Sequence, residues 1–181
     1  MEPVQEMPNP FVIVAVFAAT LLVVRLFTTL IHELGHGFFG LLLLKGNFDI
    51  YIGSYGDPDR GMHFKIGRIK LHIVYAPFST EKGVFRPESQ NTTPLKDFLV
   101  TLGGPLASLT TGALYLYLAL TMPLPEIMKM SFYILTGSSL LDFWYNIKPG
   151  TDSVTLHDGS FVYNDGYMLK YRWEQMFKKE E

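Results

Sequence analysis

The 181-residue chain contains no cysteine, so a disulfide framework, a cysteine-ligated zinc site and an iron–sulfur cluster are all excluded. It also lacks a large excess of charge of either sign. The net charge of −2 indicates no broad attraction to nucleic acid. The first ten residues contain neither Lys nor Arg. A secretory signal peptide begins with a basic segment, so we expect the apolar run that follows to be a retained membrane helix.

Apolar residues are abundant, at 48% of the chain, and the mean hydropathy is +0.18. This is apolar for a soluble domain but dilute for a pure transmembrane bundle, which indicates a few membrane spans and a polar part in water. Three runs are long and apolar enough to be spans, at about 11–44, 95–122 and 127–145. We therefore predict a single, mainly α-helical membrane domain over 1–181, with a core of three transmembrane helices in the lipid bilayer.

A different pattern separates the first two runs. Apolar and polar residues alternate with a period of two over 48–52, 62–66 and 69–73, with turn residues between them. This predicts a small antiparallel sheet over about 46–76, followed by a loop over 76–94. The sheet could serve as a cap on the membrane part. Alternatively, its edge strand could pair with an extended substrate through main-chain hydrogen bonds.

The basic residues predict a topology. Nearly all Lys and Arg lie in the 45–96 segment and the C-terminal part, whereas the N-terminus and the 121–126 turn contain none. Three spans place the two basic segments on one side, which the positive-inside rule makes cytoplasmic. We expect a multi-pass protein of the cytoplasmic (inner) membrane. The loop after the third span, about 146–166, then emerges on the same side as the C-terminal end of the first.

That C-terminal end carries the pattern H-E-x-x-H, from His32 to His36. Residues four apart share a helix face, so the two imidazoles can hold one metal ion. Glu33 can take a proton from a metal-bound water, whose pKa zinc lowers to about 7. Titratable groups within an apolar, membrane-length run cost about 2–3 kcal/mol each and usually mark function. The pattern indicates hydrolysis of an amide; the alternative is a pair of packing histidines.

A catalytic zinc usually has three protein ligands and an open position. The loop after the third span offers three carboxylates on the correct side of the membrane: Asp152, Asp158 and Asp165.

Further motifs follow in order along the chain. Gly103-Gly104-Pro105 lies in the second run, and Asn146-x-x-Pro149 ends the third and is followed by Asp-Gly pairs. With H-E-x-x-H, this series resembles the site-2-protease family of intramembrane zinc metalloproteases, in its small bacterial-type branch. The resemblance implies a core of three transmembrane helices and cleavage of membrane-protein substrates in or beside a transmembrane segment. It also implies that Glu33 is the general base and that Asn146 contacts the substrate or orients the site. We predict that Gly103 and Gly104 contact the substrate as well.

In the family, the Asp of the Asp-Gly pair is the third zinc ligand, beside His32 and His36. Two such pairs are present, Asp158-Gly159 and Asp165-Gly166, both further from Pro149 than is usual in better-known members. Asp165 directly precedes a helix-like stretch, whereas Asp158 lies between two strand-like segments, as in a hairpin turn. We therefore predict Asp165 as the ligand. Two alternative functions are a catalytically silent, metal-binding scaffold of the same fold and a metal transporter. The sequence does not specify an oligomeric state.

Overall fold

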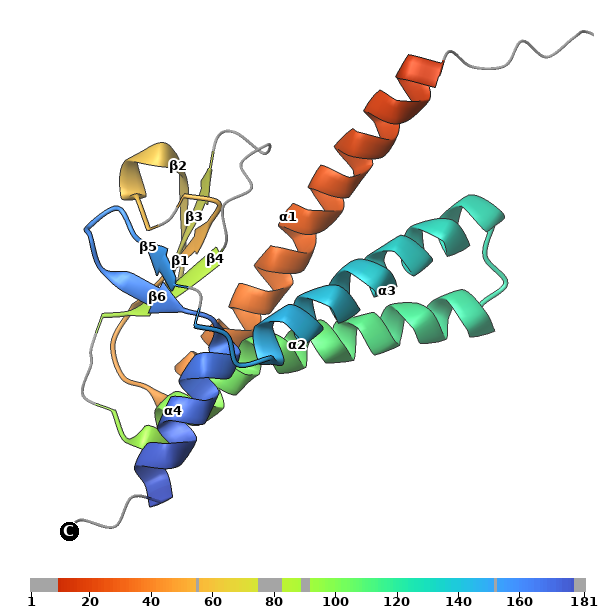
Figure 1. The fold of residues 1–181 in the computed structure, drawn as a ribbon. Helices are drawn as coiled ribbons and strands as arrows, with labels where there is room; N and C mark the ends of the chain where they lie inside the picture. Colours follow the sequence, from red (N-terminus) through yellow and green to blue (C-terminus); the bar gives the residue numbers. More distant parts are fainter. Residues whose placement is uncertain (1–9, 55, 75–82, 89–91, 152, 178–181) are drawn as a thin grey trace, which may run out of the picture.

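The computed structural model describes residues 10–54, 56–74, 83–88, 92–151 and 153–177. Three long helices carry a small sheet at one end, and a shorter helix follows (Figure 1). The helices are α1 (Pro10–Leu43), α2 (Pro94–Thr121), α3 (Glu126–Ile147) and α4 (Asp165–Phe177).

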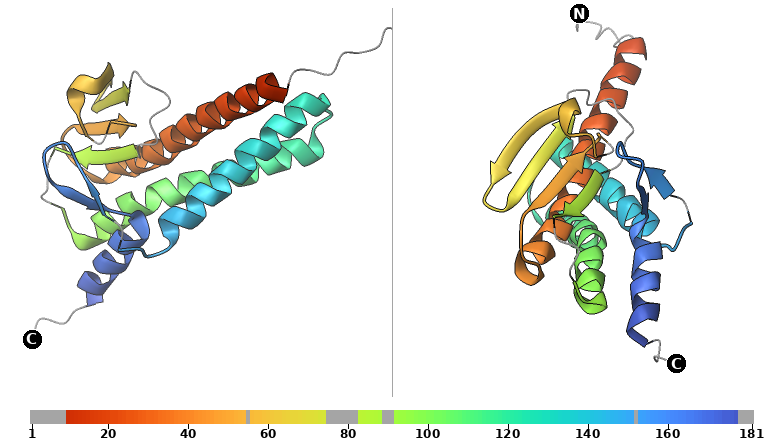
Figure 2. Two further views of the ribbon diagram at one scale, coloured as in Figure 1. Left: turned by 45° about the horizontal axis from the view of Figure 1, so that its top comes forward. Right: turned by 90° about the vertical axis from the view of Figure 1, so that its left-hand side faces the viewer.

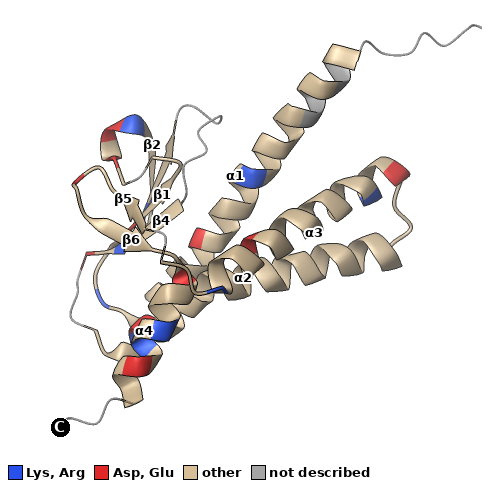
Figure 3. Ribbon diagram, in the orientation of Figure 1, with Lys and Arg blue, Asp and Glu red and all other residues tan. Residues whose placement is uncertain are grey.

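Two of the long helices have the length and composition of membrane spans. These are α1, over Ala18–Leu43, and the whole of α2. Large apolar side chains stay exposed along both; Phe38 is 59% exposed and Leu120 is 68% exposed. Such surfaces are unfavourable in water and favourable in lipid. The third predicted span does form a helix, α3, but α3 is not among the candidate spans found in the described residues. Charged residues gather around the sheet and α4 and are sparse on the long helices (Figure 3).

The helices approach closely where glycines face each other. A Cβ at Gly35 of α1 would collide with the backbone of Gly103 in α2, and a Cβ at Gly103 would collide with the backbone of Gly35. Small residues at such a crossing let two membrane helices pack backbone to backbone. Helix α2 continues through Pro105 to Thr121, although a proline inside a helix removes one main-chain hydrogen bond.

The sheet has four strands in the order β2-β3-β1-β4, with β1 at Phe48–Ile52, β2 at Gly61–Ile66, β3 at Ile69–Val74 and β4 at Gly83–Pro87. Strands β1 and β3 are parallel, and the other pairs are antiparallel. The prediction of an antiparallel sheet over about 46–76 is therefore wrong in direction: the sheet is mixed. The chain crosses from β1 to the far edge, by way of the short helix η1 (Pro58–Arg60), before β3 returns beside β1. Alternation predicts which face a side chain occupies, but not the partner or direction of its strand.

Strand β4 corrects a second expectation, because it lies within the 76–94 segment that was predicted to be a loop. Val84 is 5% exposed, and the ring of Phe85 stacks on Phe48 with centroids 5.6 Å apart. Pro, Ser and Thr residues flank this short strand, and they led to the prediction of a loop. The strand forms because its apolar side chains pack beside β1, which the local sequence does not indicate.

The sheet packs on the C-terminal half of α1 (Figure 2). Phe48 and Ile50 are fully buried. A cluster of Leu44, Phe48 and Val100, with Phe39 of α1 packed against it, joins α1, β1 and α2. Arg68, at the turn before β3, donates to the carbonyl oxygen of Leu44 at 3.0 Å, just beyond the end of α1. The segment of α1 that contains H-E-x-x-H is thus held between the sheet and α2.

The helix crossing yields a matched pair of substitutions. We expect Gly103→Ala to lower the free energy of unfolding by about 1–3 kcal/mol, because its methyl group has no space against α1. Gly137→Ala in α3 is the control, since nothing lies within 4 Å of a Cβ there. It should be neutral or should stabilise the helix by about 0.5–1 kcal/mol. Unfolding in detergent, followed by circular dichroism, measures both; equal effects would contradict the close crossing.

Candidate metal centre

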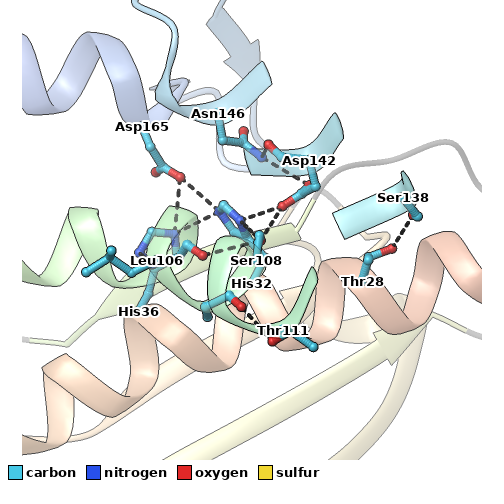
Figure 4. Close-up of polar contacts among 12 residues, drawn as sticks. Thr28, His32, His36, Leu106, Ser108, Thr111, Ser138, Asp142, Asn146 and Asp165 are labelled. Carbon is cyan, nitrogen blue, oxygen red and sulfur yellow. Dashed lines mark hydrogen bonds and ion pairs between the residues drawn. The ribbon is translucent and has the colours of Figure 1, made fainter. Parts of the chain in front are cut away.

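Two histidines from α1 and one aspartate from the start of α4 meet at a single point (Figure 4). His32 and His36 are 4% and 5% exposed, and their Nε2 atoms lie 3.2 Å apart. Oδ2 of Asp165 lies 2.8 Å from Nε2 of His32 and 3.4 Å from Nε2 of His36. This group of three can hold a metal ion. Among the described residues it is the only such group of His, Cys, Asp and Glu.

In both histidine rings Nδ1 points away from the metal group, and its hydrogen-bond partner indicates where the ring proton lies. Nδ1 of His36 lies 2.8 Å from the carbonyl oxygen of Val100, which can only accept, so we assign the ring proton to Nδ1. The amide nitrogen of Gly104 is further from the same Nδ1, at 3.3 Å. Nδ1 of His32 lies 2.8 Å from Oδ2 of Asp142, again an acceptor. With a proton on each Nδ1, both Nε2 atoms can offer a lone pair to a metal ion bound between them, as metal-ligating histidines do.

This arrangement fits a bound cation. Two lone pairs and a carboxylate oxygen converge, and without a positive charge between them they repel one another. Two imidazoles and a carboxylate are a donor set that suits zinc and other first-row transition metals. Space is also present: a Cβ at Gly104 of α2 would collide with Nε2 of His36 and lie 2.6 Å from Nε2 of His32.

The charge of Asp165 suits the same role. Burial raises the pKa of this carboxyl, but His36 and His32 lower it by more, through charge and hydrogen bonds. The net pKa lies well below its usual range. Asp165 is therefore ionised at neutral pH, as a metal-ligating carboxylate must be.

Asn164 and Gly166 hold Asp165 in place. The Asn164 side chain donates to the carbonyl oxygen of Lys148 at 2.8 Å and accepts from the amide of Tyr167 at 3.0 Å. It thereby caps α4 and ties it to the end of α3. Gly166 lies against the backbone of Ile147 and Lys148, where a Cβ would collide. Sequence reasoning did not assign a role to either residue, although Asn before a helical stretch is a capping signal.

The other candidate ligands do not join the group. Asp158 lies in the turn of a hairpin formed by β5 (Ser153–Thr155) and β6 (Phe161–Tyr163), as its flanking residues indicated. Hydrogen bonds from Ser160 and an ion pair with Arg86, at 2.6 Å, hold the pKa of the Asp158 carboxyl well below its usual range. Asp152 lies outside the described residues.

Glu33 is 5% exposed and lies beside the two histidines in sequence. Its carboxylate packs against Gly83 of β4, where a Cβ would collide with it. Phe85 of the same strand faces His36, with ring centroids 5.9 Å apart. The first residues of β4 therefore border the metal group on the side of Glu33.

The residues predicted to contact a substrate have intramolecular partners. Gly103 forms the helix crossing, and Gly104 leaves space for the two imidazoles. The amide of Asn146 donates to Oδ1 of Asp142 at 3.1 Å. Contact of these residues with a substrate stays a prediction. Sequence reasoning missed Asp142 and Ser108 as partners of His32; the only signal was a polar residue within an apolar helix.

No family model, curated protein or solved structure matches this chain. The resemblance to site-2 proteases therefore stays a prediction from the sequence motifs.

The space beside Gly104 provides a test of the metal group. We expect Gly104→Ala to abolish binding of one zinc ion per chain, because the methyl group would occupy the point where the donors converge. Helix content should persist, with Gly137→Ala as the control that keeps both. Elemental analysis and circular dichroism of the purified protein measure the two quantities. A folded Gly104→Ala protein that retains its zinc would refute this assignment.

Proposed function

We propose that the chain is a membrane-embedded zinc endopeptidase that hydrolyses peptide bonds in or near transmembrane segments of membrane proteins. The observation that carries this proposal is that His32, His36 and Asp165 converge in space. Glu33 directly follows His32 in the sequence. The three converging side chains meet beside the C-terminal half of α1, where α1 packs against the sheet and against α2. Helices α1 and α2 both have the length of a membrane span.

Zinc is the metal that this donor set favours for hydrolysis. Three protein ligands leave a position open for water or substrate, as in catalytic zinc sites generally. Bound zinc would polarise the scissile carbonyl and lower the pKa of a water molecule to about 7. His32, His36 and Asp165 would hold it, each through the atom that faces the other two.

Glu33 is the residue we assign as general base. It follows a ligand directly on the helix, and its carboxylate is buried against β4, away from bulk water. In this role it takes a proton from the attacking water and then delivers it to the amine that leaves.

Strand β4 offers a way to present the peptide. It lies at the edge of the sheet, with β1 on one side and no strand on the other among the described residues. An extended substrate paired with β4 would pass Gly83, and therefore Glu33. Such pairing provides affinity through main-chain hydrogen bonds that do not depend on substrate sequence.

The proposed setting is a cytoplasmic (inner) membrane. With α3 as a third span, the described basic residues of the 45–96 segment and those of α4 lie toward the sheet end, where charge gathers (Figure 3). The positive-inside rule makes that end cytoplasmic, and it is the end that holds the metal group.

Glu33→Gln separates catalysis from metal binding. We expect the variant to retain about one zinc per chain, because all three ligands remain, and to lose at least 100-fold in cleavage rate, because the amide cannot take a proton. The assay uses reconstituted single-span model substrates labelled at both ends. Unchanged cleavage by Glu33→Gln would remove this residue from the mechanism. Wild-type protein that binds zinc but cleaves no substrate would instead favour the catalytically silent scaffold.

The two late aspartates provide a second comparison. Asp165→Ala should lose zinc, because it removes one of the three converging donors, whereas Asp158→Ala should keep it. Zinc content measured after dialysis against a weak chelator distinguishes them. The reverse pattern would transfer the ligand role to Asp158.

A further inference from the structure

Asp142 of α3 lies behind His32, on the side of the ring away from the metal group (Figure 4). Its Oδ2 is 2.8 Å from Nδ1 of His32 and accepts from the hydroxyl of Ser108 at 2.6 Å. Its Oδ1 accepts from the amide of Asn146 at 3.1 Å. Three helices thus contribute to one hydrogen-bond network: α1 through His32, α2 through Ser108, and α3 through Asp142 and Asn146.

The donors around Asp142 leave its carboxylate little freedom. One oxygen is occupied by His32 and Ser108, and the other by Asn146, which lies one helical turn further along α3. The Asn146 amide also donates to the main-chain carbonyl oxygen of Asp142, at 3.0 Å. The side chain of Asp142 is 23% exposed, so water screens these contacts only in part.

The two metal-facing histidines are oriented in different ways. His36 donates to the main-chain carbonyl oxygen of Val100, a partner that no side-chain substitution removes. His32 has two side-chain partners at Nδ1: Asp142, and the Ser108 hydroxyl at 3.1 Å. A carboxylate can only accept, whereas a hydroxyl can also donate. With Ser108 alone, a hydroxyl proton directed at Nδ1 would place the ring proton on Nε2, where it would block coordination.

Building on the proposed zinc site, we infer that Asp142 is the positioning residue of His32. It keeps a proton on Nδ1 and turns Nε2 toward the metal group, and Asn146 holds Asp142 in that orientation. Carboxylates that accept from a metal-ligating histidine raise its basicity and fix its orientation. The role links metal affinity to the packing of α3 against α1.

The same helix interface contains a control. Thr28 and Ser138 share a hydrogen bond of 2.9 Å, one turn before the contact between His32 and Asp142 on both helices. Ser138→Ala removes a contact between α1 and α3 of similar length, without touching a proposed ligand. A loss that came only from weaker packing would therefore appear in both variants.

The first measurement is zinc affinity by chelator competition in detergent. We expect Asp142→Ala to weaken zinc binding by about 10–100-fold, the range typical of lost carboxylate partners of metal-ligating histidines, and Ser138→Ala to leave it unchanged. Asn146→Ala should weaken it to a smaller extent, because Asp142 keeps its other two donors. Equal affinity in the wild type and Asp142→Ala, or equal loss in Asp142→Ala and Ser138→Ala, would overturn the inference.

The second measurement uses the metal-free protein. The chain has five histidines, so nitrogen-15 labelling of histidine with His32→Ala as a reference assigns the His32 ring in the NMR spectrum. We expect Nδ1 of His32 to be protonated in the wild type and in Ser138→Ala, and to lose its proton in Asp142→Ala, where the tautomer protonated only at Nε2 appears. An unchanged tautomer in Asp142→Ala would overturn the inference even if the wild type binds zinc. A wild type that binds no zinc would overturn the proposed function, while the tautomer would still decide the role of Asp142.

Discussion

The structure depends on one electrostatic constraint: two imidazole lone pairs and a carboxylate charge meet in a buried place. Nε2 of His32, Nε2 of His36 and Oδ2 of Asp165 lie 2.8–3.4 Å from one another. Such a grouping needs positive charge shared among its members, from a bound metal ion or from protons on the imidazoles, because burial removes the water that would otherwise screen their repulsion. Much of the surrounding architecture brings these atoms together and keeps other groups out of the space between them.

The helices supply that precision by different means. Glycines let α1 and α2 approach until their backbones touch at Gly35 and Gly103, and the absence of a side chain at Gly104 keeps the point of convergence open. Outer hydrogen bonds then orient each ring, from a main-chain carbonyl for His36 and from Asp142 for His32. Imidazole rings that are already oriented by hydrogen bonds at Nδ1 lose little further conformational entropy when a metal binds. More of the free energy of metal coordination therefore appears as affinity.

The sheet adds the second half of the site. Buried Phe48 and Ile50 fix it on the C-terminal half of α1, and this brings the edge strand β4 against Glu33 and His36. The hairpin of β5 and β6 leads directly to Asp165 and is tied back to β4 by the ion pair of Asp158 with Arg86. Asp158, which the sequence did not favour as a ligand, therefore helps to anchor the segment that leads to Asp165, which it did favour.

Local patterns in the sequence determined the long helices, strands β1, β2 and β3, the shared face of His32 and His36, and the helix start at Asp165. Each depends on periodicity or on capping and turn residues within a few positions. Tertiary structure alone decided the parallel pairing of β1 with β3, the strand β4 inside a polar segment, and the partnership of His32 with Asp142. It also brought Asp165 to His32 across 133 positions of the chain. The reason is physical: a residue's conformation follows from its neighbours in sequence, whereas its distant partners follow from how whole elements bury their surfaces against one another.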